Sequence, residues 1–310
     1  MSVEKSFLKL KEIHKTGKIG GAWLVYGEKG VGKRTLLKRF CGYLLSGEDK
    51  SLDFHQDLRW ITCDYTDKDK KEILKTIKEG RIVTEEMERG FKRKSEITVD
   101  DIRSGINFLS MTSSGDKWRI LVIDSADDMN ENAANALLKV LEEPPSQSII
   151  FLVSHNKGRL LPTIKSRCRE LTVLPLSKEE TQKYLEENYP DTQDIDVIIK
   201  LSNGSVGKIK NLIENNEYEN YLKTYEFLTS EKNKTEDIYD FCGQMSEENP
   251  TALKDYLSFF VLQKTKEGTK TRDYLDLWDE MQQTFREMDN LYLDKKNTFA
   301  DLFFKIGALS

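Results

Sequence analysis

The 310-residue sequence has little cysteine, and its cysteines are not arranged as metal ligands. Cys41, Cys63, Cys168 and Cys242 include no pair at CxxC spacing, and no histidine cluster accompanies them. Structural zinc sites need ligands at such spacings, and disulfide scaffolds need a denser set of cysteines. We therefore expect reduced, unligated thiols, with neither a zinc site nor a disulfide framework.

The sequence also lacks a long hydrophobic run. Its longest apolar runs resemble IIFLV at 149–153, whereas a membrane-spanning helix needs about 20 apolar residues. The first residues, MSVEKSFLKLKEI, mix both charge signs and contain no apolar signal region. We expect a cytoplasmic protein that does not bind a membrane.

There is no excess of positive charge. The 48 basic and 53 acidic side chains give a net charge of −5, so the whole chain does not attract nucleic acid and any DNA contact would be local. The 33% charged and 38% hydrophobic residues are an ordinary balance for a globular protein.

Five short apolar runs occur in the first 175 residues. Their continuous apolar character predicts strands covered on both faces, and hence an α/β domain with a parallel sheet and crossover helices. The runs are AWLVY (22–26), LRWITC (58–63), RILVI (119–123), IIFLV (149–153) and LTVL (171–174).

The rest of the chain has helical patterns. The charged segment 64–96 is expected to be a partly helical surface insertion. Thr98 with Asp101, and Ser177 with Glu180, are spaced as capping boxes at helix starts. After 225 an apolar stripe at helical spacing predicts an all-α segment that buries the stripe internally or against a partner. The stripe consists of Leu275, Trp278, Met281, Phe285, Met288 and Leu291.

A phosphate-binding motif follows the first predicted strand. The segment from Gly27 to Lys33 fits GxxxxGK, and its candidate nucleotide-binding residues are Gly27, Gly30, Gly32 and Lys33. Such a loop and the following helix N-terminus direct backbone N–H groups at phosphate oxygens. The hydroxyl that should follow the lysine and bind Mg²⁺ is replaced by Arg34, and Thr35 comes one position late. ATP with Mg²⁺ is a candidate ligand; the alternative is a retained turn that no longer binds nucleotide.

The third predicted strand ends at Asp124, which could hold Mg²⁺ through water. ATPases of this architecture usually have Glu next, to orient the attacking water, but Ser125 is too short for that task. Asp127 and Asp128 are interpreted as surface or helix-capping acids.

The motifs NALLKVLEEPP (135–145) and SRC (166–168) complete a family pattern. Through most of residues 1–215 the chain resembles the delta-prime subunits of bacterial DNA polymerase III clamp loaders, within the AAA+ superfamily. The resemblance implies an AAA+ P-loop domain with a five-stranded parallel sheet (1–175), a helical lid (176–225) and a helical collar for oligomerisation (226–310). It implies gamma/tau and delta subunits as partners, and contact with the sliding clamp and primed DNA through the complex.

The resemblance also assigns residues. It places Ser154 at the first sensor position and Arg167 as an arginine finger that reaches a neighbouring subunit. Active clamp-loader ATPases carry an arginine in the lid where this chain has Gly207, next to Lys208. Many members have a four-cysteine zinc module, but this chain has only Cys63 in that interval, so zinc is not expected.

Together, Arg34, Ser125 and Gly207 favour a clamp-loader subunit with little or no ATPase activity. One alternative is a catalytically active, gamma/tau-like ATPase in which Thr35 shifts into the metal site. Another is a nucleotide-dependent DNA-binding switch unrelated to clamps, which leaves the SRC motif and the collar unexplained.

Overall fold

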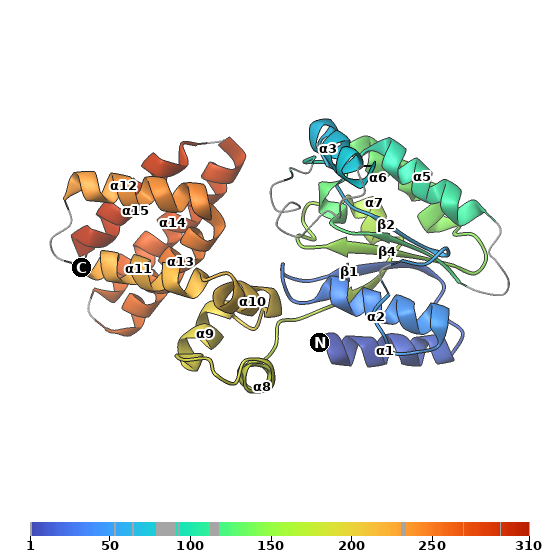
Figure 1. Ribbon diagram of the computed structural model, residues 1–310, viewed down its shortest axis with the longest axis horizontal. Coiled ribbons are helices and arrows are strands. Elements are labelled where there is room, and N and C mark those ends of the chain that lie inside the picture. The colour runs from blue at the N-terminus through green and yellow to red at the C-terminus, as the bar shows by residue number, and fades with distance from the viewer. Residues whose placement is uncertain are drawn as a thin grey trace. The chain divides into compact units, whose positions relative to one another are not determined.

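The computed structural model describes residues 2–309 except 53, 64, 79–90, 92–93, 112–117, 231–233, 269 and 292. The chain forms two compact units (Figure 1). The first consists of Met1–Leu176 with Ser205–Gly207, and the second of Ser177–Gly204 with Lys208–Ser310.

The first unit contains a five-stranded parallel sheet in the order β2-β3-β4-β1-β5. Each predicted strand is present, so the expected α/β architecture with a parallel sheet is confirmed. The strands are β1 (Gly21–Tyr26), β2 (Leu58–Ile61), β3 (Arg119–Ile123), β4 (Ser148–Ser154) and β5 (Arg169–Thr172).

Helices cover both faces of this sheet (Figure 1). Successive side chains of a strand point to opposite faces, so Trp23 packs in one core with Phe7 and Phe40, while Leu24 packs in another with Leu137. Helices α1 and α2 contribute to the first core, and α5 and α6 to the second. The elements are α1 (Val3–Lys15), α2 (Lys33–Ser46), α3 (Asp67–Lys78), α5 (Val99–Ser110), the 3-10 turn η1 (Ala126–Asp128), α6 (Glu131–Glu142) and α7 (Pro162–Lys165).

Two strands, β2 and β5, differ from the prediction by two residues at a boundary. Strand β2 ends at Ile61, two residues early, while β5 begins at Arg169, two residues before the apolar run. As an edge strand, β5 pairs on one side only, with β1, and its first two residues, Arg169 and Glu170, are exposed. An apolar pattern cannot locate a strand end whose side chains face water.

Both predicted capping boxes are confirmed, by Thr98 with Asp101 at α5 and by Ser177 with Glu180 at α8. Of the predicted insertion 64–96, α3 is helical, and residues 64, 79–90 and 92–93 lie outside the described part of the chain. No helix among the described residues is long and apolar enough to cross a membrane.

The second unit is all-α. Among its described residues, one hydrophobic cluster runs from Leu185 to Ile306, and α11 crosses the predicted lid–collar boundary at 225. The division into lid and collar remains a prediction. The helices after the sheet are α8 (Lys178–Asn188), α9 (Ile195–Ser202), α10 (Val206–Glu214), α11 (Glu217–Thr229), α12 (Thr235–Glu248), α13 (Pro250–Lys266), α14 (Thr271–Leu291) and α15 (Lys295–Leu309).

The apolar stripe of α14 belongs largely to this core. Met281, Phe285 and Met288 are buried within the unit, whereas Leu275 is 48% exposed. Tyr274 and Leu277 are buried instead of Leu275. The buried face of α14 therefore begins at Tyr274, one residue before the first residue of the predicted stripe. Most of the stripe is therefore buried internally, which was one of the two expected outcomes.

Two residues of the same predicted stripe should differ in their effect on stability. Met281 is 1% exposed, so Met281→Ala should lower the free energy of unfolding of the second unit by about 2–5 kcal/mol, through lost apolar burial and a residual cavity. Leu275→Ala is the matched control and should change it by less than about 0.5 kcal/mol. Urea unfolding followed by circular dichroism measures both. Equal losses would contradict the internal packing of this stripe.

Candidate nucleotide site and arginine finger

The phosphate loop joins β1 to α2, and its glycines are required by its geometry. Gly30 and Gly32 have φ angles of +86° and +93°, in the left-handed region that favours glycine. A Cβ atom on Gly27 would overlap the carbonyl oxygen of Val173, and one on Gly30 would overlap the Ser205 hydroxyl. The glycines are therefore needed for the tight packing of this turn.

Lys33 points into its own loop. Its Nζ donates hydrogen bonds to the carbonyl oxygens of Gly27, at 2.5 Å, and Glu28, at 2.7 Å, and the residue is only 4% exposed. Burial lowers the pKa of Lys33 to about 8, against the opposing effect of the Asp127 and Asp124 carboxylates. The ammonium group that would meet a phosphate is thus bonded to backbone oxygens.

Arg34 lies against the carboxylate that would hold the metal. Its Nη1 is 3.3 Å from Oδ2 of Asp124, and its guanidinium lies 5.4 Å from the centre of the Trp60 ring. The Arg34 side chain is 56% exposed, so the ion pair stabilises the fold by only about 0–1 kcal/mol. It does bring a positive charge to the carboxylate. Because this arginine also replaces the metal-binding hydroxyl, the residues present do not fit a Mg²⁺ site, and Thr35 lies exposed on α2.

Residues 205–207 belong to the first unit and pack on the phosphate loop. The N–H of Gly207 donates a hydrogen bond to the carbonyl oxygen of Gly30 at 2.9 Å. The Ser205 hydroxyl donates to the carbonyl oxygen of Lys29 at 3.3 Å. A Cβ on Gly207 would lie 2.8 Å from the Gly30 Cα, closer than side-chain atoms approach. The position where the resemblance implied an arginine therefore has no room for a side chain in this arrangement.

A hydrogen-bond network joins the tips of β3 and β4. Asp127 accepts hydrogen bonds from the Ser154 hydroxyl, at 2.7 Å, and from the backbone N–H groups of His155 and Asn156. The interpretation of Asp127 as a surface or capping acid missed this role. Ser125 has a left-handed backbone, with φ +63°, and the chain turns there into η1. No sequence pattern indicated that turn.

His155 lies beside the same cluster. Its Nε2 is 3.3 Å from the Ser125 hydroxyl, and burial, with the nearby Lys33 charge, lowers the pKa of its imidazole. Burial next to Asp127 raises the pKa of Asp128. A cavity of about 350 Å³ lies beside Asp124 and Asp128. Among the described residues, no group of three or more histidine, cysteine or acidic side chains could hold a metal ion.

Arg167 lies at the other end of the sheet from the phosphate loop. It precedes β5, whose first residue, Arg169, pairs with Trp23 of the parallel strand β1. The phosphate loop starts four residues beyond Trp23, so Arg169 lies about 13 Å from the loop along the strands, at about 3.3 Å per residue. Arg167, two residues before Arg169, is therefore at the end of β5 that faces away from this chain's own phosphate loop.

The Arg167 guanidinium is held on the surface by its own chain. Its Nη2 lies 3.3 Å from Oε2 of Glu142, at the end of α6, and its Nη1 donates to the carbonyl of Thr163 at 3.1 Å. Its side chain is one-third exposed. The arrangement presents a charged, partly fixed donor group outward from the start of β5.

The sequence and the fold of this chain are similar to those of known proteins. A family model described as DNA polymerase III, delta subunit, matches residues 3–177. The delta' subunit of DNA polymerase III from Pseudomonas aeruginosa is 31% identical over 186 residues, which is 59% of this chain and 53% of that protein. The gamma subunit from Buchnera aphidicola is 29% identical over 64% of this chain and 52% of its own length.

The matches to these two relatives span about half of each relative's length. The delta' subunit from Buchnera aphidicola is 24% identical over 89% of this chain and 80% of its own length. A crystal structure of a DNA polymerase III gamma subunit-related protein from Thermotoga maritima matches the whole chain with a TM-score of 0.55 at 17% identity. It supports the predicted AAA+ clamp-loader fold.

The pKa of Lys33 tests whether its side chain is buried against the carbonyl groups of its own phosphate loop. Because Lys33 is desolvated, we expect its side chain to titrate near pH 8, more than two units below an exposed lysine. Asp127→Asn should lower that pKa further, since it removes a carboxylate that favours the charged ammonium. NMR of lysine side chains labelled with ¹³C measures both values. A Lys33 pKa above 10 in the wild-type chain would show that the ammonium is solvated and the loop open.

Proposed function

This chain belongs to the DNA polymerase III delta-prime family of clamp-loader subunits, and we propose that it serves as the non-hydrolysing member of such a complex. In this role it assembles like a motor subunit and supplies Arg167 to the nucleotide site of a neighbour. The observation that carries the proposal is the Arg34 guanidinium beside Asp124, where an active ATPase would hold Mg²⁺.

Three features argue against hydrolysis at the chain's own site. The metal position is positively charged because of Arg34, and Ser125 has no carboxylate to orient water. Gly207 gives the site no cation from residues 205–207, and its contact with Gly30 leaves no room for one. Charge that develops on a transferred phosphoryl group would therefore lack support from the protein.

Arg167 is suited to act on another subunit. Its guanidinium is always charged, and its planar fork of donors can bind two phosphate oxygens at once. Its place at the amino end of β5 keeps it away from its own phosphate loop, so a partner's bound nucleotide is the proposed target. The contacts with Glu142 and Thr163 limit the rotamers of the side chain before assembly.

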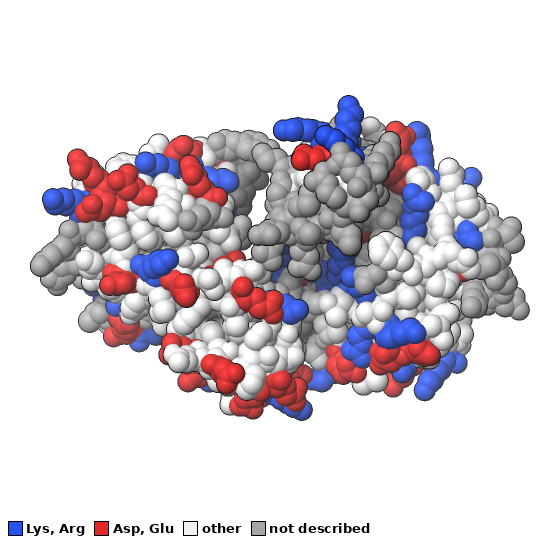
Figure 2. Space-filling model, viewed as in Figure 1, with Lys and Arg blue, Asp and Glu red and all other residues white. Residues whose placement is uncertain are grey.

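The proposed partners are gamma/tau and delta subunits, with the sliding clamp and primed DNA reached through the complex. We propose that the helices after residue 225 form the collar through which subunits assemble. Basic and acidic side chains are interspersed over the described residues of the face in Figure 2, consistent with DNA contacts that are local rather than spread over a basic surface.

The isolated chain should hydrolyse ATP no faster than its Lys33→Ala variant. Lys33→Ala removes the residue that any phosphate-loop ATPase needs, so the variant defines the background rate. A coupled phosphate-release assay with Mg²⁺ and ATP makes the comparison. Turnover clearly above the background would favour the alternative of an active, gamma/tau-like ATPase.

In a reconstituted loader, Arg167→Ala should leave the complex assembled but slow ATP hydrolysis at the adjacent motor subunit. Arginine fingers contribute roughly 10³–10⁵ in rate in GTPases, and we expect a smaller loss, of at least about tenfold, because several sites share the work. Arg169→Ala, two residues away, is the matched control. Unchanged DNA-stimulated ATPase in an assembled Arg167→Ala complex would remove the finger assignment.

A further inference from the structure

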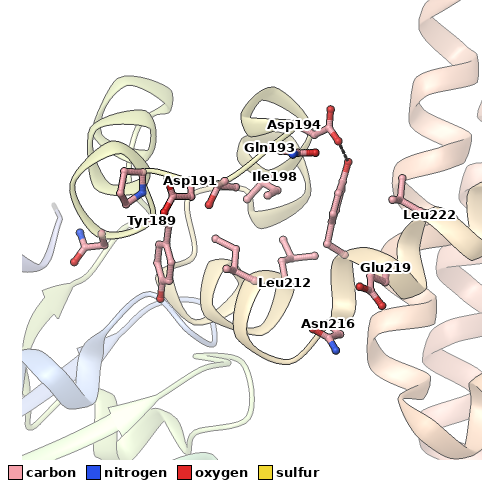
Figure 3. A pocket seen from close by; sticks show the side chains of 14 residues that line it. Tyr189, Asp191, Gln193, Asp194, Ile198, Leu212, Asn216, Glu219 and Leu222 are labelled. Atoms are coloured by element: carbon pink, nitrogen blue, oxygen red, sulfur yellow. Dashed lines mark hydrogen bonds between the residues drawn. The ribbon is translucent and has the colours of Figure 1, made fainter.

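The second unit contains a pocket unrelated to the nucleotide site. It has a volume of about 560 Å³ and is formed by the segment after α8, by α9, by the end of α10 and by the start of α11. In Figure 3, Ile198 and Leu212 lie between Tyr189 on one side and the hydrogen bond made by Asp194 on the other. Its volume falls within the range of roughly 300–1,000 Å³ usual for ligand pockets.

The charged side chains that line this pocket have one sign. Among the described residues, its lining includes Asp191, Asp194 and Glu219 but no lysine or arginine. Asp191 and Glu219 are exposed, so their charges face solvent beside the apolar floor. An acidic rim around apolar side chains attracts a partner that combines positive charge with an apolar group.

The rim is held in place by hydrogen bonds. The Tyr218 hydroxyl donates to Asp194 at 2.8 Å, and the Tyr189 hydroxyl donates to Glu214 at 2.5 Å. Burial and the Asp194 carboxylate raise the pKa of Tyr218 to about 12, so the phenol stays a donor at neutral pH. The two tyrosines therefore form fixed walls.

Two helix starts at the pocket do not use their usual caps. Asp194 precedes α9 and Asn216 precedes α11; both residue types are favoured N-caps, yet neither makes a side-chain cap hydrogen bond. Both have left-handed backbones, with φ of +54° and +55°. The Asp194 side chain instead reaches Tyr218, and Asn216 lines the pocket.

Apolar surface continues beyond the cavity along α11. Leu222 lines the pocket and is 45% exposed, and Tyr225, three residues further on, is 37% exposed. Residues three and four apart share one face of a helix, so Tyr218, Leu222 and Tyr225 form a continuous strip. A small molecule in the cavity would leave this strip uncovered, whereas a peptide segment could cover both.

We propose that this pocket binds a segment of a partner protein in which an apolar side chain is flanked by lysine or arginine. The apolar side chain enters between Tyr189 and Tyr218 and contacts Leu212. The flanking basic groups pair with Asp191 and Glu219, and the segment continues over Leu222.

Peptide selection followed by charge reversal tests this proposal. A phage library of nine-residue peptides, with a central aromatic or aliphatic residue and eight random positions, is selected on the full chain. We expect enriched peptides with lysine or arginine on both sides of the centre. Enrichment without basic residues, or no enrichment, would overturn the proposal.

An enriched peptide labelled with fluorescein then gives affinities by anisotropy. Glu219→Lys should weaken binding about tenfold or more, because it replaces attraction by repulsion at the rim. Glu236→Lys, at an exposed position of α12 outside the pocket and away from the α11 strip, is the matched control and should change affinity less than twofold. Circular dichroism checks that both variants remain folded.

The double variant Asp191→Lys, Glu219→Lys should prefer the same peptide with its basic residues changed to glutamate. Equal weakening by Glu219→Lys and Glu236→Lys would overturn the proposal. So would equally tight binding of N-acetyl-tryptophanamide, which would mark a small-molecule pocket rather than a peptide site.

Discussion

The carboxylate of Asp124 has a guanidinium beside it where a motor subunit of this fold would hold a metal ion, and the account of the site depends on that contact. The arginine of this ion pair is more than half exposed, so the pair adds little stability. The ion pair matters because of where it lies: it brings the positive charge of Arg34 to the Asp124 carboxylate. In the proposed function, this charge disfavours a divalent cation at the position where a nucleotide would share it.

The surrounding residues are consistent with a loop kept for packing. Lys33 turns to the carbonyls of its own loop, and Gly207 closes on Gly30. The Ser154 hydroxyl donates to Asp127, so the predicted sensor residue has a partner within the chain. These contacts give the glycines and Lys33 structural roles that do not require a bound nucleotide.

The sequence could predict the sheet because its strands are buried on both faces, which leaves continuous apolar runs. It also placed Asp124 after β3, Ser154 at the tip of β4 and Arg167 before β5. It could not predict the role of Asp127, which depends on a left-handed turn at Ser125 that no local pattern marks.

Other features also needed the three-dimensional structure. The contact between Arg34 and Asp124 joins residues 90 positions apart, and nothing in either segment indicates the pairing. The internal packing of α14 was left open because a helix facing its own core and one facing a partner show the same periodicity. The acidic pocket is assembled from several helices and loops that each look like ordinary solvated surface.

Equilibrium dialysis of radiolabelled ATP with Mg²⁺ against the isolated chain tests the central claim most directly. In this account Lys33 is hydrogen-bonded to carbonyls of its own phosphate loop and Arg34 lies at the metal position. We therefore expect no saturable ATP binding at nucleotide concentrations up to the millimolar range. Binding of one ATP per chain at micromolar concentrations, dependent on Mg²⁺ and lost in Lys33→Ala, would contradict the account.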